Sequence, residues 1–240
     1  MPFNSFMIDK SRPFCSAVVV AAGSSQRMGG DKMMLELGGM PILARTLCAM
    51  DACECIDEIV VVTQQEKIMD VAKLCRDYGI EKATKIVCGG VNRSESSLAG
   101  VCEISTKAKL VAIHDGARPL VEEEVVRRAV HAASLHKAAA PAVPIKDTVK
   151  IVKGDVVVKT PNRAATKAVQ TPQVFVPELI KAALTYVMQN ELEVTDDCSA
   201  VELLDVPVRL TEGSDENIKI TTPRDLMIAQ IILDSRENGV

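Results

Sequence analysis

Short apolar segments alternate along this chain with longer segments that have helical periodicity. Four of the short segments are nearly continuous in valine, isoleucine and alanine. Such runs are typical of strands that are buried on both faces. Repeated strand–helix–strand order predicts an α/β fold, with a mostly parallel sheet and helices on both faces. The predicted strands are Ser16–Ala22, Glu58–Thr63, Lys85–Val87 and Lys109–His114.

The segments between and after these strands predict helices. Proline suits the first turn of a helix, so the first helix is predicted to begin at Pro41. Right-handed connections between parallel strands place ligands at the carboxyl ends of the strands. We therefore expect the chemistry directly after each strand. The predicted helices are Pro41–Ala52, Gln65–Tyr78 (closed by Gly79), Ser94–Ser105, Glu122–His136, Pro177–Asn190 and Pro223–Leu233.

The alternation is interrupted between Pro144 and Arg163. Two short β-prone runs, Lys150–Lys153 and Val156–Lys159, are joined by Gly154-Asp155, which is a turn signal. They predict a β-hairpin arm, at about residues 144–165, inserted into a single α/β domain of residues 1–240. The apolar edges of such an arm need cover, and a second subunit can provide it. We therefore expect a homodimer through the arm.

Charge and composition exclude several classes of protein. The 240 residues are 48% hydrophobic and 25% charged, which is ordinary for a globular domain. Lys and Arg number 28 against 32 Asp and Glu, for a net charge of -4. Nucleic-acid binding begins with a basic face, so no nucleic-acid partner is predicted.

Membrane and secretory classes are not supported either. The longest apolar run, around Ala17–Ala22, is far shorter than the roughly 20 residues that cross a bilayer, so no membrane partner is predicted. Met1–Phe14 has no continuous apolar region of the kind that secretory signals carry. The eight cysteines show no Cys-x-x-Cys and no zinc-type Cys/His spacing. We predict a cytoplasmic protein with free thiols.

The segment after the first strand, Ala21–Lys32 (AAGSSQRMGGDK), is the most informative for function. Its small residues let the backbone approach a ligand closely, and successive N–H groups in such a loop can bind an anion. Arg27 and Lys32 add two positive charges. This combination suits a nucleoside triphosphate, although a glycine-rich turn with solvated cations has the same composition.

Two familiar phosphate-binding motifs do not fit this loop. A P-loop needs a second glycine five residues after Gly23, where Met28 stands, followed by Lys. The dinucleotide fingerprint G-x-G-x-x-G fails at Ser25. A nicotinamide-dependent oxidoreductase is therefore disfavoured.

The loop resembles the A-A-G-x-x-x-R-M-G-x-x-K signature of sugar-phosphate nucleotidyltransferases, and five later segments narrow the resemblance. In their order they are similar to the 2-C-methyl-D-erythritol 4-phosphate cytidylyltransferase family, which acts in non-mevalonate isoprenoid synthesis. The likeness covers roughly Ser16 to Leu233 and implies a Rossmann-like nucleotidyltransferase fold. The later segments are Gly89–Ser96 (GGVNRSES), His114–Pro119 (HDGARP), Pro144–Lys150 (PIKDTVK), Gln170–Gln173 (QTPQ) and Asn217–Leu226 (NIKITTPRDL).

The resemblance implies a reaction between CTP and a sugar-alcohol phosphate that releases pyrophosphate, with Mg²⁺ on the triphosphate. An acceptor phosphate oxygen would attack the α-phosphorus in line. Such a transfer needs positioning and positive charge more than covalent chemistry. A phosphomonoester is already ionised near neutrality, so no general base is required.

The resemblance also implies the site residues. Arg27 and Lys32 would stabilise the transition state, and Arg163 and Lys219 would hold the acceptor phosphate. Asp115 would contact the ligand near Mg²⁺. The remaining residues implied on the nucleotide side are Val20, Ala21, Ala22, Gly23, Gly90, Ser96 and Gly116. The acceptor side would again include Gly116, together with Arg118, Thr148 and Thr171. In a dimer the arm would carry Arg163 and Thr148 to the partner's site.

The sequence departs from the family pattern at a few positions. Met33-Met34 follow Lys32 where the family usually has Gln-Phe or Gln-Tyr, and Val91 stands where an acidic residue is sometimes found. Two alternatives remain. One is a ribitol 5-phosphate cytidylyltransferase, which shares the nucleotide half, and the other is a non-catalytic nucleotide-binding protein on the same fold.

Overall fold

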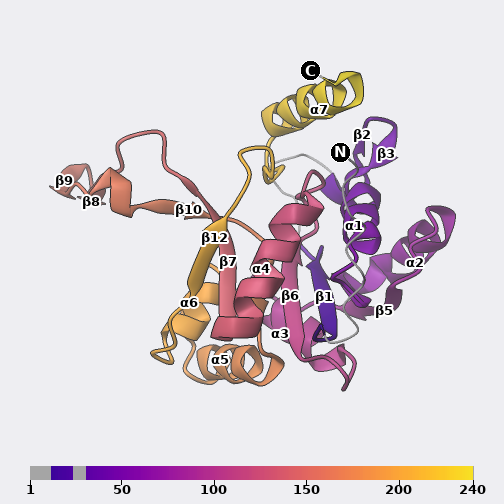
Figure 1. Cartoon of the computed structure of the whole chain (residues 1–240), viewed down its shortest axis with the longest axis horizontal. Helices are drawn as coiled ribbons and strands as arrows, with labels where there is room; N and C mark the ends of the chain where they lie inside the picture. The colour runs from indigo at the N-terminus through magenta and orange to yellow at the C-terminus, as the bar shows by residue number, and fades with distance from the viewer. Residues whose placement is uncertain (1–11, 24–30, 240) are drawn as a thin grey trace, which may run out of the picture.

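An eight-stranded sheet forms the centre of the molecule in the computed structural model, which describes residues 12–23 and 31–239 (Figure 1). Its strands are β1 (Cys15–Val20), β4 (Glu58–Thr63), β5 (Ala83–Cys88), β6 (Leu110–Asp115), β7 (Ala138–Pro144), β10 (Lys167–Val169), β11 (Gln173–Phe175) and β12 (Arg209–Glu212). The order is β10-β7-β11-β6-β1-β4-β5, with β12 also paired to β7. β6, β1, β4 and β5 are parallel neighbours, whereas β11 is antiparallel to β6 and β7. The predicted mostly parallel sheet is confirmed.

Helices cover both faces of this sheet because successive strand residues point to opposite sides. Within β1, Ala17 and Val19 belong to one hydrophobic core and Val18 to the other. The first core includes residues of α1 (Ile42–Ala52), α2 (Ile68–Asp77) and α4 (Glu123–His136). The second core includes residues of α3 (Arg93–Glu103), α5 (Pro177–Gln189) and α6 (Asp197–Glu202).

A third, smaller core lies at the end of the molecule that carries α7 (Pro223–Asn238) (Figure 1). Leu233 of α7 packs there with Leu37, Ile42 and Ile220. Leu37 comes from a two-stranded ribbon, β2 (Glu36–Leu37) and β3 (Met40–Pro41). This core joins the end of the chain to the segment that follows the glycine-rich loop.

Three predicted helix boundaries need correction. Pro41 does not begin α1; it pairs with Glu36 in the β2–β3 ribbon and precedes the helix with ψ 140°. The second helix begins at Ile68 after a 3₁₀ turn over Gln65–Lys67. α7 continues past Leu233 to Asn238 because Gly239, with φ +68°, is its left-handed cap.

The sequence analysis also missed four strands of the sheet. β7 reads AAAPAVP, and alanine and proline are depleted in strands, so its sequence carries no strand signal. β10 and β11 are two short strands that pair with β7 and are separated by residues 170–172. β12 is only four residues long. Pairing with β7 in the folded protein, rather than local sequence, therefore defines β10, β11 and β12.

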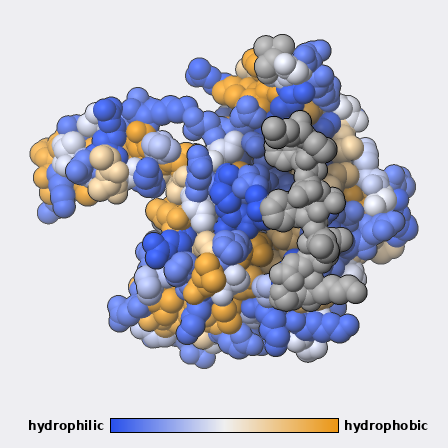
Figure 2. Space-filling model, viewed as in Figure 1, coloured by the Kyte–Doolittle hydropathy of each residue, from blue (hydrophilic) through white to orange (hydrophobic). Residues whose placement is uncertain are grey.

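The predicted hairpin arm is present. β8 (Ile151–Lys153) and β9 (Val156–Lys159) pair with each other across a turn in which Gly154 has φ +60°. The arm extends away from the sheet between β7 and β10 (Figure 1). Its valines are exposed, by 71% at Val156 and 65% at Val158, and apolar side chains gather at its far end (Figure 2).

The structure also shows whether any helix could span a membrane and the state of the cysteines. Across residues 12–23 and 31–239, no helix combines the length and the apolar composition that crossing a membrane requires. All eight cysteines are free thiols; the Sγ atoms of Cys53 and Cys55 lie 3.2 Å apart in the core.

Candidate active site

A cavity of about 490 Å³ opens where the parallel strands β1, β4, β5 and β6 end, which is where the topology predicts a ligand. Residues from all four strand ends line it, and Lys219 joins them from a segment near the end of the chain. Of the residues predicted for the site, those that line this cavity are Val20, Ala22, Gly23, Lys32, Gly90, Ser96, Asp115 and Lys219. Ala21 and Gly116 are buried directly behind it.

The segment after β4 contacts the chain on both sides of the glycine-rich loop. Before the loop, the Gln64 side chain donates from Nε2 to the Ala22 carbonyl at 3.3 Å. After it, Lys67 forms an ion pair with Asp31, 2.7 Å between Nζ and Oδ2. Asp31 also accepts the Met33 N–H and so caps the 3₁₀ turn Lys32–Met34. These contacts position Lys32 at the cavity, whereas Arg27 lies outside the described residues.

The glycine pair after β5 is required by close packing. A Cβ on Gly89 would lie 2.5 Å from the Cβ of Ala22, and a Cβ on Gly90 would lie 2.2 Å from that of Glu95. Buried Ser96 accepts the Gly90 N–H at 3.2 Å and donates its hydroxyl hydrogen to the Asn92 carbonyl at 2.9 Å. Because this hydrogen is used within the protein, the Ser96 oxygen can only accept a hydrogen bond from a ligand.

Asp115, the last residue of β6, is at the centre of a cluster of charges. Its Oδ2 lies 3.0 Å from Lys219 Nζ and 3.3 Å from Arg118 Nε, and its Oδ1 lies 3.6 Å from Arg93 Nε. Burial alone would raise the pKa of Asp115, but the charges of Lys219, Arg93 and Arg118 outweigh it and hold the pKa well below its usual range. Asp115 is therefore a carboxylate at neutral pH.

A buried hydrogen-bond network lies behind Asp115. The Thr171 hydroxyl accepts the Asp115 N–H at 3.1 Å and lies 3.0 Å from His114 Nδ1. His114 Nε2 lies 3.3 Å from the Arg118 carbonyl, which can only accept, so Nε2 carries the hydrogen and Thr171 donates to Nδ1. Burial lowers the pKa of His114 to about 4, so the ring is neutral. Thr171 thus holds the backbone of Asp115 in place by a hydrogen bond behind the cavity.

The segment that carries Lys219 is anchored to this same network. Buried Asn217 donates from Nδ2 to the Thr171 carbonyl at 2.9 Å, and its own carbonyl accepts from Arg118 Nη1 at 2.6 Å. Ile220, fully buried, donates its N–H to the Ala117 carbonyl at 2.9 Å. Arg118 therefore bridges Asp115 and the Lys219 segment rather than lining the cavity itself.

Thr148 and Arg163 lie apart from this cavity. Both are exposed on the arm, and Arg163 Nη1 lies 3.5 Å from the Lys146 carbonyl. Within the described part of one chain, neither residue lines the cavity. The geometry thus brings Lys32, Asp115 and Lys219 together and leaves Thr148 and Arg163 on the arm. The roles implied for all of these residues stay predictions.

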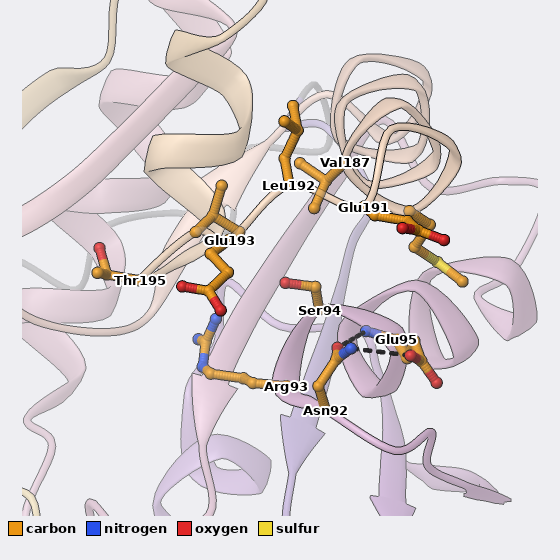
Figure 3. Close-up of a pocket in the computed structure, with 11 residues that line it drawn as sticks. Asn92, Arg93, Ser94, Glu95, Val187, Glu191, Leu192, Glu193 and Thr195 are labelled. Atoms are coloured by element: carbon orange, nitrogen blue, oxygen red, sulfur yellow. Dashed lines mark hydrogen bonds between the residues drawn. The ribbon is translucent and has the colours of Figure 1, made fainter.

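The sequence analysis assigned no role to Arg93, Asn92 or Gln64, although all three line the cavity. Arg93 stands inside the G-G-x-x-R-x-x-S segment, so its place in that motif was an available signal. Asn92 caps α3 by accepting the Glu95 N–H at 2.9 Å. Arg93 and Asn92 also line a second cavity of about 800 Å³, between the start of α3 and residues 187–195 (Figure 3).

The chain from β1 into α7 matches the profile of a known protein family. The family profile of IspD, 2-C-methyl-D-erythritol 4-phosphate cytidylyltransferase, matches residues 15–235. The chain belongs to this family. The family-level resemblance noted from the sequence motifs is thereby confirmed.

Two named relatives and one solved structure are similar to this chain over most of its length. The 2-C-methyl-D-erythritol 4-phosphate cytidylyltransferases of Halalkalibacterium halodurans and Caldanaerobacter subterraneus are each 43% identical to this chain. The matches cover 92% and 91% of this chain and 98% of each relative. The crystal structure of 4-diphosphocytidyl-2C-methyl-D-erythritol synthase from Anaerococcus prevotii superposes with a TM-score of 0.83 at 33% identity, over 92% of this chain and 96% of that one. The predicted nucleotidyltransferase fold is confirmed.

Proposed function

We propose that this protein transfers a cytidylyl group from CTP to 2-C-methyl-D-erythritol 4-phosphate. The products are 4-diphosphocytidyl-2-C-methyl-D-erythritol and pyrophosphate. Family membership supports the reaction, and one observation on the chain itself carries it. Lys32 and Lys219, from opposite ends of the chain, line the same cavity at the carboxyl ends of the parallel strands, where a triphosphate and an anionic acceptor can both meet positive charge.

The chain's residues act mainly by position and charge. An acceptor phosphate oxygen forms the new bond to the α-phosphorus while the bond to the β-phosphate oxygen breaks, and pyrophosphate leaves with that electron pair. Lys219, held by the segment around Asn217, orients the acceptor phosphate. Lys32 neutralises charge on the α-phosphate and the leaving group. Both ring nitrogens of buried His114 are engaged in hydrogen bonds within the protein, so His114 is not placed to take a proton from the acceptor.

We propose that Mg²⁺ accompanies the triphosphate. Asp115 is the one carboxylate among the described residues that line the cavity, and no group of three or more potential metal ligands occurs in residues 12–23 and 31–239. This fits Mg²⁺, which commonly binds through one or two carboxylates with substrate phosphates and waters as its other ligands. The ion would neutralise phosphate charge, and Asp115 would be its protein ligand.

A substrate panel tests the proposed function. The purified protein, with CTP, Mg²⁺ and methylerythritol phosphate, is expected to release pyrophosphate, and ribitol 5-phosphate is expected to be a poor acceptor. ATP, GTP and UTP in place of CTP measure the base preference. Equal or faster turnover with ribitol 5-phosphate would reassign the acceptor, and absence of turnover with every acceptor would favour a non-catalytic nucleotide-binding protein.

We further propose that the protein is a cytoplasmic homodimer in which each arm completes the partner's site. Thr148 and Arg163 lie on the arm, away from their own chain's cavity, and the arm exposes an apolar surface at Val152 and Val156–Val158. A solvent-exposed hairpin of this kind gains cover by packing on another subunit. Arg163 would then supply a second cation for the acceptor phosphate from the partner.

Mixing two inactive variants tests this arrangement. Lys219→Ala disables the cavity of its own chain, whereas Arg163→Ala disables the arm that serves the other chain. After co-expression, a heterodimer has one site with both defects and one site with neither, so mixed preparations are expected to regain activity that neither parent has. A monomer by light scattering, or no recovery in an isolated heterodimer, would contradict the arm's proposed role.

A further inference from the structure

Arg93 is held between two carboxylates on different elements. It is the first residue of α3, and its Nη2 lies 2.8 Å from Asp197 Oδ2 at the start of α6. Its Nε lies 3.6 Å from Asp115 Oδ1 at the end of β6. Figure 3 shows the side chain reaching from the start of α3 toward the segment that carries Glu193 and Thr195. Arg93 therefore lies between the candidate active site and the neighbouring cavity.

Asp197 is the more deeply buried of the two carboxylates. Its side chain is 1% exposed, against 9% for Asp115 and 27% for Arg93. A buried carboxylate is costly unless it is paired, and Arg93 is the cation that pairs with it. α6 holds Asp197 firmly in place, because Asp196 and Ser199 form a capping box around the helix start. Asp197 thus provides a rigid anchor for the guanidinium.

The pairing of Arg93 with Asp197 affects the arrangement of charges around Asp115. Asp115 Oδ2 is contacted by Lys219 and Arg118, whereas Oδ1 faces Arg93 at the longer distance. With Asp197 in place, Arg93 shares its charge between two carboxylates. Without that partner, Coulomb attraction would draw Arg93 onto Asp115 Oδ1 and away from the cavity, while Lys219 and Arg118 keep their contacts with Oδ2. The arrangement of cations that faces the cavity would change.

We propose that Asp197 is a positioning residue for nucleotide binding, which acts by holding Arg93 at the cavity wall. This inference rests on the proposed function only for the identity of the nucleotide. Asp197 is absent from the described residues that line the cavity, so its influence passes through Arg93. Arg93, which lines the cavity, is held where its charge faces the bound phosphates instead of being drawn onto Asp115 Oδ1.

The first test is Asp197→Asn, which removes the charge and keeps the shape. The KM for CTP is expected to rise by about 10-fold to 100-fold, on the analogy of the loss seen when a residue that orients a metal ligand is changed. The kcat and the KM for the acceptor are expected to change much less. Calorimetric binding of CTP with Mg²⁺ is expected to weaken by the same factor. That readout does not depend on turnover, so failure of the proposed reaction and failure of this inference are distinguishable.

The matched control is Asp57→Asn. Asp57 holds Arg12 through two 2.7 Å hydrogen bonds and also accepts the Cys15 N–H at the amino end of β1, the end opposite the cavity. This variant also breaks an arginine–carboxylate pair, but its affinity for CTP is expected to stay at the wild-type value. Equal loss of CTP affinity in both variants would show that Asp197 contributes only to stability.

A double-mutant cycle tests the route through Arg93. In an Arg93→Met background, Asp197→Asn is expected to cause no further loss of CTP affinity, because the anchored group is already absent. Losses that add would show that Asp197 acts by another route. If Asp197→Asn does not fold, Arg93→Lys replaces it, since lysine keeps the charge but lacks the planar fork that faces both carboxylates. Unchanged CTP affinity in a folded Asp197→Asn or Arg93→Lys protein would overturn the proposal.

Discussion

Replacing Lys219 by alanine is expected to lower kcat/KM for the acceptor by about 1,000-fold, the upper range for loss of a group that stabilises a transition state electrostatically. The substitution removes a cation from the cavity and also removes a partner of Asp115, whose carboxylate lies 3.0 Å away. The Asp115 carboxylate, with one cation fewer beside it, then repels the acceptor phosphate more strongly. Steady-state kinetics with varied acceptor would show the fall in both kcat and affinity.

The fold is expected to survive this change, because Arg118 and Arg93 still face Asp115. Lys85→Ala is a suitable control: Lys85 has a side chain of similar exposure (45% against 39%) and pairs with Glu103 at 3.2 Å, but it does not line the cavity. Its activity and its melting temperature are expected to match the wild type. Wild-type kinetics in Lys219→Ala would show that Lys219 serves only as an ion-pair partner.

Replacing Lys32 by methionine is expected to lower kcat by about 100-fold to 1,000-fold, because a charge-assisted donor is lost where negative charge builds up in the transition state. Methionine keeps most of the side-chain length, so packing at the cavity is retained. The KM for CTP is expected to change less than kcat, since the other residues that line the cavity can still contact the ground-state triphosphate. Single-turnover measurements separate this loss from product release.

Lys73→Met is the matched control for Lys32. Lys73 is a 72% exposed lysine of α2 that pairs with Asp77 at 3.3 Å, and it does not line the cavity. Its kcat is expected to be unchanged. Normal turnover in Lys32→Met would mean that the loop presents a different cation, and Arg27→Met would then be the variant to compare.

The strength of local signals explains which parts of the fold could be predicted. The strand Glu58–Thr63 agrees with the structure at both ends because six consecutive buried residues leave no competing pattern. β7 could not be predicted, because alanine and proline are depleted in strands and its buried alanines carry no local strand signal. Pro41 was misplaced because its preference for a helix start is satisfied equally well just outside the helix, where the ribbon with Glu36 forms.

Similar reasoning applies to the site. Lys32 could be found because it lies in the loop after the first strand, where small residues and two cations stand close together in the sequence. Asp115 was implied by the family resemblance, and its place at the end of β6 agrees with the expectation of a site at the strand ends. Lys219 was implied only by the family resemblance, since its place beside Asp115 depends on the contacts of Asn217 and Ile220. Asp197 carried no signal, because its partner Arg93 is more than one hundred residues away in the chain.

By itself, the order of residues in this chain determined the class of fold, the edge of the sheet where the candidate site lies and the family to which the chain is similar. Those properties follow from periodicity and from short motifs, which depend on neighbours in the chain. Only the tertiary structure decided which charges face one another around Asp115 and that Thr148 and Arg163 lie away from their own cavity. Electrostatic pairing depends on distance in space, and folding brings together residues whose separation along the chain says nothing about that distance.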